Sequence, residues 1–150
     1  MYTDNFNKAL HFVLNEEGGF VNNPNDSGGA TNKGITQSTY NAYRRIKHLP
    51  IQSVKGISDS EVSEIYYNNY WLESGADKIN DFKLALIVFD TAVNMGNSIA
   101  KLFLKNSGNN FDKYCTIRIN DYYAIVKKYP EDKEFLQGWL NRVNALKNYK

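Results

Sequence analysis

The chain has 150 residues and a formal net charge of +2, with 42% hydrophobic and 23% charged residues. These values fit one domain with a sizeable core and exclude a disordered chain. The charge is too small to indicate a nucleic acid partner. Because no stretch of about 20 apolar residues occurs, we expect no membrane-spanning segment. The single cysteine, Cys115, excludes an internal disulfide and is expected to be buried.

The first predicted helix begins at Thr3 or Asp4 and ends at the glycine pair that follows Glu17. Glu17 therefore lies at or near the C-terminal end of this helix. Residues 20–35 are rich in glycine and asparagine, which predicts a long irregular segment that can include a small β-hairpin. Compact domains rarely keep such segments without a use, so we expect a functional site there.

The rest of the chain is predicted to be mainly helical. Thr36 is placed to cap a helix that ends at His48-Leu49-Pro50, and Ser58 with Glu61 forms a capping box for the next one. Apolar spacing predicts helices over residues 59–72, 82–95, 98–105, 111–128 and 131–147. The helix at 82–95 is apolar nearly all round, as expected of a central buried helix. The prediction is a mainly α single domain.

Glu17, Asp26 and Thr31 bring two carboxyl groups and a hydroxyl to the glycine-rich segment, and a sugar-cleaving site needs such groups. The partial negative charge of a helix C-terminus disfavours a carboxylate there by about 0.3–1 kcal/mol. Glu17 thus breaks a local rule, and such breaks often mark function. Each residue also has an ordinary alternative role: Glu17 in a solvated last turn, Asp26 in an Asx turn and Thr31 as a loop hydroxyl.

The combination resembles the Glu–Asp–Thr constellation of phage-type lysozymes, and the longer string resembles glycoside hydrolase family 108. Phe20 stands where that family often has tyrosine, and Ser27 where it often has proline. The similarity spans nearly the whole chain and is carried by Glu17-Gly18-Gly19-Phe20, Pro24-x-Asp26-x-Gly28-Gly29-Ala30-Thr31-Asn32-x-Gly34-Ile35-Thr36, Tyr70-Trp71, Phe89-Asp90-Thr91-Ala92-Val93-Asn94-Met95-Gly96 and Phe135-Leu136-x-Gly138-Trp139-x-Asn141-Arg142.

The resemblance implies one lysozyme-like domain over residues 1–150. Residues 1–75 would form the catalytic half, and residues 76–150 would form a helical half that resembles the family's peptidoglycan-binding region. It also implies hydrolysis of the β-1,4 bond between N-acetylmuramic acid and N-acetylglucosamine without a metal or cofactor. Glu17 would protonate the glycosidic oxygen. Asp26 would stabilise the oxocarbenium-like state or help to orient water, and Thr31 would hold that water.

Six further residues are expected at the substrate: Phe20, Asn32, Tyr70, Trp71, Asp90 and Asn94. Aromatic residues on a helix belong more often to a core. Asp90 and Asn94 are four residues apart and share one face of the buried helix, where internal hydrogen bonding is favoured over substrate contact. Trp139 and Arg142 are expected to hold the last helix to the body of the domain. The histidines and the cysteine have no metal-ligand spacing.

The expected partner is the glycan strand of peptidoglycan, bound by a monomer. The N-terminus lacks the pattern of a secretory signal. We therefore expect synthesis in the cytoplasm and access to the cell wall after holin-type release, as for an endolysin, or through dedicated export, as for a secretion activator. Two alternatives stay open. One is a lytic transglycosylase that uses Glu17 alone, and the other is a non-catalytic module for wall binding or secretion assembly.

Overall fold

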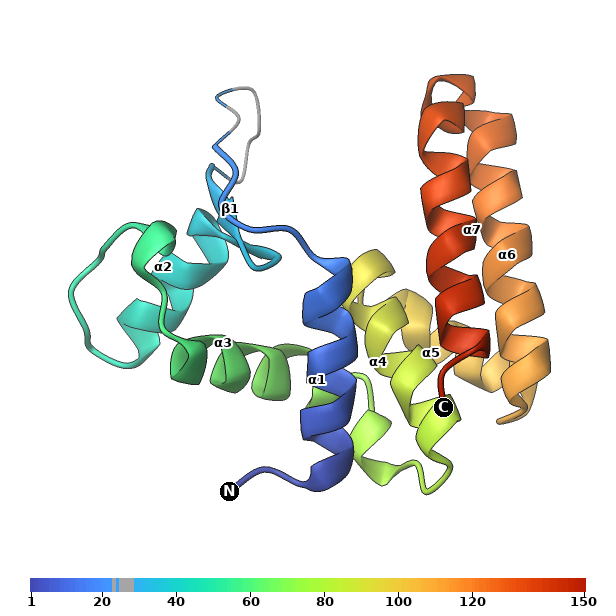
Figure 1. Ribbon diagram of the computed structural model, residues 1–150, viewed down its shortest axis with the longest axis horizontal. Helices are drawn as coiled ribbons and strands as arrows, with labels where there is room; N and C mark the ends of the chain where they lie inside the picture. Colours follow the sequence, from blue (N-terminus) through green and yellow to red (C-terminus); the bar gives the residue numbers. More distant parts are fainter. Residues whose placement is uncertain (23, 25–28) are drawn as a thin grey trace. The chain divides into compact units, whose positions relative to one another are not determined.

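The computed structural model describes residues 1–22, 24 and 29–150 (Figure 1). These residues are mainly α-helical, as predicted, and the sheet they form has two short strands. The chain divides into two compact units, residues 1–69 and 70–150. No helix in the described part of the chain is both long and apolar enough to cross a membrane.

The first unit begins with α1 (Asp4–Glu16), which buries one apolar stripe. Thr3 caps it, because its side-chain oxygen accepts a hydrogen bond from the backbone N–H of Phe6 at 3.3 Å. The buried stripe consists of Phe6, Ala9, Leu10 and Val13, at the spacing of one helix face. The helix ends where Glu17 takes an extended conformation, so the predicted start and end of this helix are both confirmed.

A small antiparallel hairpin follows the glycine-rich segment, which confirms the β-hairpin that the sequence allowed. Strands β1 (Thr31–Asn32) and β2 (Ile35–Thr36) pair directly. The turn residues Lys33 and Gly34 both have positive φ, at 52° and 77°. Two such residues in succession are typical of a type I′ turn, whose twist matches that of paired strands.

Helix α2 (Gln37–Ile46) is capped by Thr36, as predicted. After the 3₁₀ turn η1 (Val54–Gly56) comes α3 (Asp59–Tyr66), which begins with the predicted capping box. The predicted helix over 59–72 is α-helical only to Tyr66, and it continues as the π-helix η2 (Tyr67–Leu72). The η2 segment is rich in tyrosine and asparagine, which favour the α-helix only weakly.

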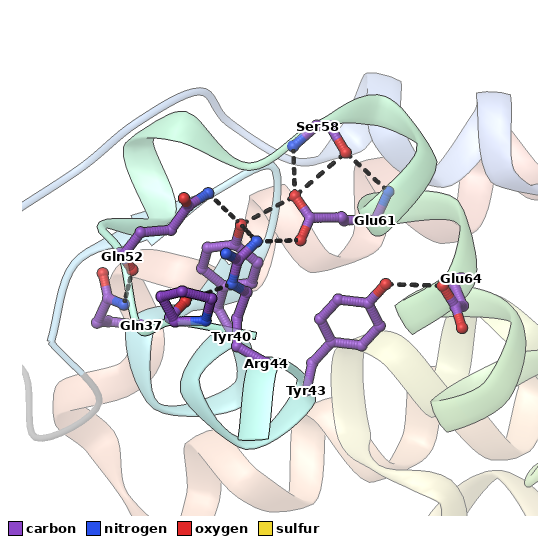
Figure 2. A network of polar contacts seen from close by, with 9 residues as sticks. Gln37, Tyr40, Tyr43, Arg44, Gln52, Ser58, Glu61 and Glu64 are labelled. Carbon is purple, nitrogen blue, oxygen red and sulfur yellow. Dashed lines mark hydrogen bonds and ion pairs between the residues drawn. The ribbon is translucent and has the colours of Figure 1, made fainter. Parts of the chain in front are cut away.

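A polar network joins α2 to α3 (Figure 2). Glu61 of α3 accepts hydrogen bonds from the Tyr40 hydroxyl and from Arg44, both at 2.9 Å. Beside it the Tyr43 hydroxyl donates to Glu64 at 2.7 Å. Burial alone would raise the pKa of Glu61, but the hydrogen bonds it accepts hold that pKa below its usual value. The network fixes α3, and with it the residues that α3 presents to the hairpin.

The second unit is helical throughout its described elements. Its helices are α4 (Phe82–Met95), α5 (Asn97–Ser107), α6 (Phe111–Lys128) and α7 (Lys133–Lys147), with the 3₁₀ turns η3 (Ala76–Lys78) and η4 (Pro130–Asp132). Helix α4 is buried from Leu84 to Ala92, which confirms it as the central helix of this unit. Helices α6 and α7 lie side by side (Figure 1).

A buried ion-pair cluster holds α4, α6 and α7 together. Asp90 of α4 has no exposed surface and pairs with Arg118 of α6 and Arg142 of α7, each at 2.8 Å. Burial would lower the pKa of Arg118, but the neighbouring Asp90 charge holds it above its usual value. The contact of Arg142 confirms its predicted role in holding the last helix to the rest of the unit.

Candidate active site

Glu17 lies at the point where α1 ends and the chain turns toward the hairpin. Its backbone is extended, with φ −90° and ψ 152°, and its N–H donates to the Val13 carbonyl at 3.1 Å. The side chain is half-buried and lies against Gly34 in the hairpin turn. A Cβ atom on Gly34 would come within 2.9 Å of Glu17 Cγ and 3.1 Å of Glu17 Cδ. The missing side chain of Gly34 therefore makes the room that Glu17 occupies.

Tyr66 approaches the same turn from the end of α3. The tyrosine is fully buried, and its hydroxyl donates to the Lys33 carbonyl at 2.7 Å. A Cβ atom on Gly34 would collide with that hydroxyl. Glu17, at the end of α1, and Tyr66, at the end of α3, thus pack against the same glycine. Together they fix the hairpin turn at Gly34.

Thr31 lies at the base of the glycine-rich segment. Its backbone exchanges two hydrogen bonds with Val21, both at 2.7 Å, and this bridge closes the segment between them. Asp26, the second predicted carboxylate, is in that segment but outside the described residues. Since Thr31 begins the hairpin whose turn touches Glu17, the structure brings the Glu17 and Thr31 elements together.

The side chain of Asn32 connects strand β1 to the 3₁₀ turn η1. It is only 8% exposed, and its amide nitrogen donates to the carbonyls of Val54 and Lys55 at 3.1 and 3.2 Å. Gln37 supports the same junction by accepting from the Val54 N–H at 2.7 Å. The Lys55 ammonium in turn lies 5.5 Å from the ring centre of Phe20, which is 41% exposed beside the loop. Of the two substrate contacts predicted here, Asn32 is buried and Phe20 has surface available to a ligand.

The other predicted substrate contacts lie in the second unit. Trp71 is 3% exposed and packs edge-to-face on Phe89, with ring centres 5.3 Å apart. Trp71 and Asp90 therefore have almost no exposed surface with which to contact a substrate. The Trp71 ring belongs to the apolar core, and the Asp90 carboxylate is buried with its paired charges. Tyr70 is half-buried. Asn94 is exposed and accepts a hydrogen bond from the Tyr122 hydroxyl at 2.7 Å.

The turn also carries a charge pair that the sequence alone did not reveal. Lys33 reaches Asp59 at the start of α3, with 2.6 Å between Nζ and Oδ1. This hydrogen bond lowers the pKa of the Asp59 carboxyl. Within the described ranges no group of three or more histidine, cysteine, aspartate or glutamate side chains could hold a metal ion.

These features define the class of protein. The fold is mainly α and lysozyme-like, and a glutamate at the end of its first helix lies against a hairpin that follows a glycine-rich segment. Residues 10–96 match the family described as Glycosyl hydrolase 108, so the chain belongs to that glycoside hydrolase family.

A solved structure from Brucella abortus supports the same fold. The chain is similar to SagA of that organism, with a TM-score of 0.72 and 25% sequence identity. The comparison covers 94% of this chain and 90% of that one. No curated protein sequence matches the chain.

Proposed function

We propose that the protein is an N-acetylmuramidase that hydrolyses the β-1,4 bond between N-acetylmuramic acid and N-acetylglucosamine in peptidoglycan. The observation that carries this proposal is the position of Glu17. It lies at the end of α1, and its side chain packs against Gly34 of the hairpin turn. Family membership supports glycoside hydrolysis as the reaction class.

Glu17 would act as the general acid. A general acid must be held within hydrogen-bond reach of the leaving oxygen, and a side chain confined by packing meets that requirement. The end of α1 fixes the backbone of Glu17, and Gly34 with Tyr66 fixes the surface on which its side chain lies. The carboxyl group would protonate the glycosidic oxygen as the bond to the sugar breaks.

Asp26 and Thr31 would complete the site. Asp26 would supply the second carboxylate that glycosidases use beside the general acid, and it would stabilise the oxocarbenium-like state or help to orient the attacking water. Thr31, whose backbone is fixed by Val21, would hold that water. Phe20 would offer its exposed ring to a sugar face. Because the substrate is the cell wall, the enzyme would act there after release or dedicated export.

Digestion of purified peptidoglycan, followed by mass analysis of the soluble products, tests the proposal. A muramidase gives fragments with reducing N-acetylmuramic acid ends. Fragments with anhydro-muramic ends would identify a lytic transglycosylase instead. Protein that pellets with the wall and releases no soluble sugar would identify a binding module. The Asp26→Asn and Thr31→Ala variants, assayed in parallel, separate the roles of the two loop residues.

A further inference from the structure

The second unit contains a cavity of about 410 Å³. Its volume lies within the range of small-ligand sites. The cavity is lined by residues of α4, α5, α6 and α7, and one of them is Asn94, which was expected from the sequence to lie at the substrate. Its walls are mostly apolar, and they include Met95, Ile99, Ile125 and Trp139.

Asp121 places a carboxyl group on this apolar wall. Within the described residues it has no hydrogen-bond or ion-pair partner, although it is partly buried. Burial raises the pKa of Asp121. Because no side chain in the described part of the chain pairs with it, the Asp121 carboxyl can accept hydrogen bonds from a ligand in the cavity.

The neighbouring side chains are already engaged. Tyr122 donates to Asn94 at 2.7 Å and accepts from Arg118 at 3.0 Å. Trp139 is stacked on Tyr122 and on Phe135, with ring centres 5.0 and 6.1 Å apart. A sugar needs an open aromatic face and many polar partners, and this cavity offers few of either.

In the part of the chain that the structure describes, the arginines nearest to this cavity are already paired elsewhere. Arg118 lies against the Tyr122 ring, 5.7 Å from its centre, but it is ion-paired with Asp90. Arg142 is ion-paired with the same carboxylate. Asp121 therefore keeps a negative charge on the cavity wall that a positively charged ligand can pair with.

We propose that this cavity binds a primary ammonium group carried on an aliphatic chain. Asp121 would accept the hydrogen bonds of the ammonium, and the apolar walls would bury the methylene groups. Resting on the proposed function, the ligand would be the side-chain amine of a diamino acid in the peptide stems of peptidoglycan. A free polyamine has the same chemistry and is the alternative source.

Titration of the full chain followed by NMR tests this site. The probe is Nα-acetyl-L-lysine amide, and Nα-acetyl-L-norleucine amide is the matched control without the amine. We expect saturable shifts at the Trp139 indole with the lysine probe and at least tenfold weaker binding of norleucine. The Asp121→Asn variant should also bind the lysine probe at least tenfold more weakly, whereas Asp112→Asn, an exposed change on the same helix, should bind it normally.

Three results would overturn the proposal. They are equal binding of the two probes, undiminished binding of the lysine probe by Asp121→Asn, and no saturable binding at millimolar concentrations. A lysine-containing stem peptide that binds more tightly than cadaverine supports the wall as the source of the amine. The opposite order supports the ammonium site and assigns it to a free polyamine. The titration breaks no glycosidic bond, so its outcome does not depend on whether Glu17 is the general acid.

Discussion

Replacement of Gly34 by alanine tests how the protein positions Glu17. At this position φ is +77°, and an added Cβ would meet the Tyr66 hydroxyl and Glu17 Cγ. Gly75 provides a matched control, because its φ is +81° and an added Cβ would meet nothing within 4 Å. Both variants carry the backbone strain of a left-handed alanine, and only Gly34→Ala disturbs the site.

The two variants should differ in stability and in activity by amounts that can be approximated from their contacts. A left-handed alanine costs roughly 1–2 kcal/mol, which is the whole loss expected for Gly75→Ala. Gly34→Ala should also disrupt the hydrogen bond from Tyr66 to Lys33, worth roughly 0.5–1.5 kcal/mol, for a total of about 1.5–3.5 kcal/mol. The displaced Glu17 matters more for catalysis, since a shift of about 1 Å in a catalytic group can lower the rate about 10²-fold.

Two assays follow the two effects. Denaturant unfolding measures the stability of each variant, and dye release from labelled peptidoglycan measures activity where both proteins are folded. We expect Gly75→Ala to retain nearly full activity and Gly34→Ala to lose about 10²-fold. If the two variants have equal activity per folded molecule, Gly34 does not position the catalytic group.

Three further predictions concern the scaffold. Asp90→Asn should lower the free energy of unfolding by about 3–5 kcal/mol in a denaturant titration, because it leaves two buried arginines without their carboxylate. Glu61→Gln should cost about 1.5–3 kcal/mol at pH 7 through its lost charged hydrogen bonds. Since the folded-state pKa of Glu61 is lowered, its stabilisation is present above its ordinary value of 4.5 and is lost as pH falls through the folded-state pKa. Unfolding titrations from pH 7 to pH 3 should therefore show a shallower acid loss in Glu61→Gln than in wild type, and parallel curves would contradict this. Cys115 is fully buried, and burial raises the pKa of its thiol. A thiol reagent should therefore label it only at the rate at which the protein opens. Immediate labelling of the native protein would contradict this packing.

Local chemistry explains why the helices could be predicted from the sequence. Thr3, Thr36 and Ser58 are helix caps whose hydrogen bonds reach only three residues along the chain. The apolar α4 had to be central, because a helix without a polar face has no side for water. The π-helical turn after Tyr66 was missed, since low helix propensity does not by itself specify a wider turn.

The site was predictable only in part. The helix-end position of Glu17 follows from the glycine pair after it. The approach of both Glu17 and Tyr66 to Gly34, however, joins three elements distant in sequence. No local pattern encodes such a contact. The position of Asp90 on the buried helix favoured internal hydrogen bonding over substrate contact, but its arginine partners come from helices far along the chain and no local pattern identifies them.

The activity of Glu17→Gln, measured beside that of Glu16→Gln, tests directly whether Glu17 is the general acid. The two glutamates are adjacent, but Glu16 is exposed and ends α1, whereas Glu17 lies against the hairpin turn. We expect Glu17→Gln to stay folded and to release no soluble fragments from purified peptidoglycan, whereas Glu16→Gln should digest it as wild type does. Wild-type release of reducing fragments by Glu17→Gln would contradict the central claim.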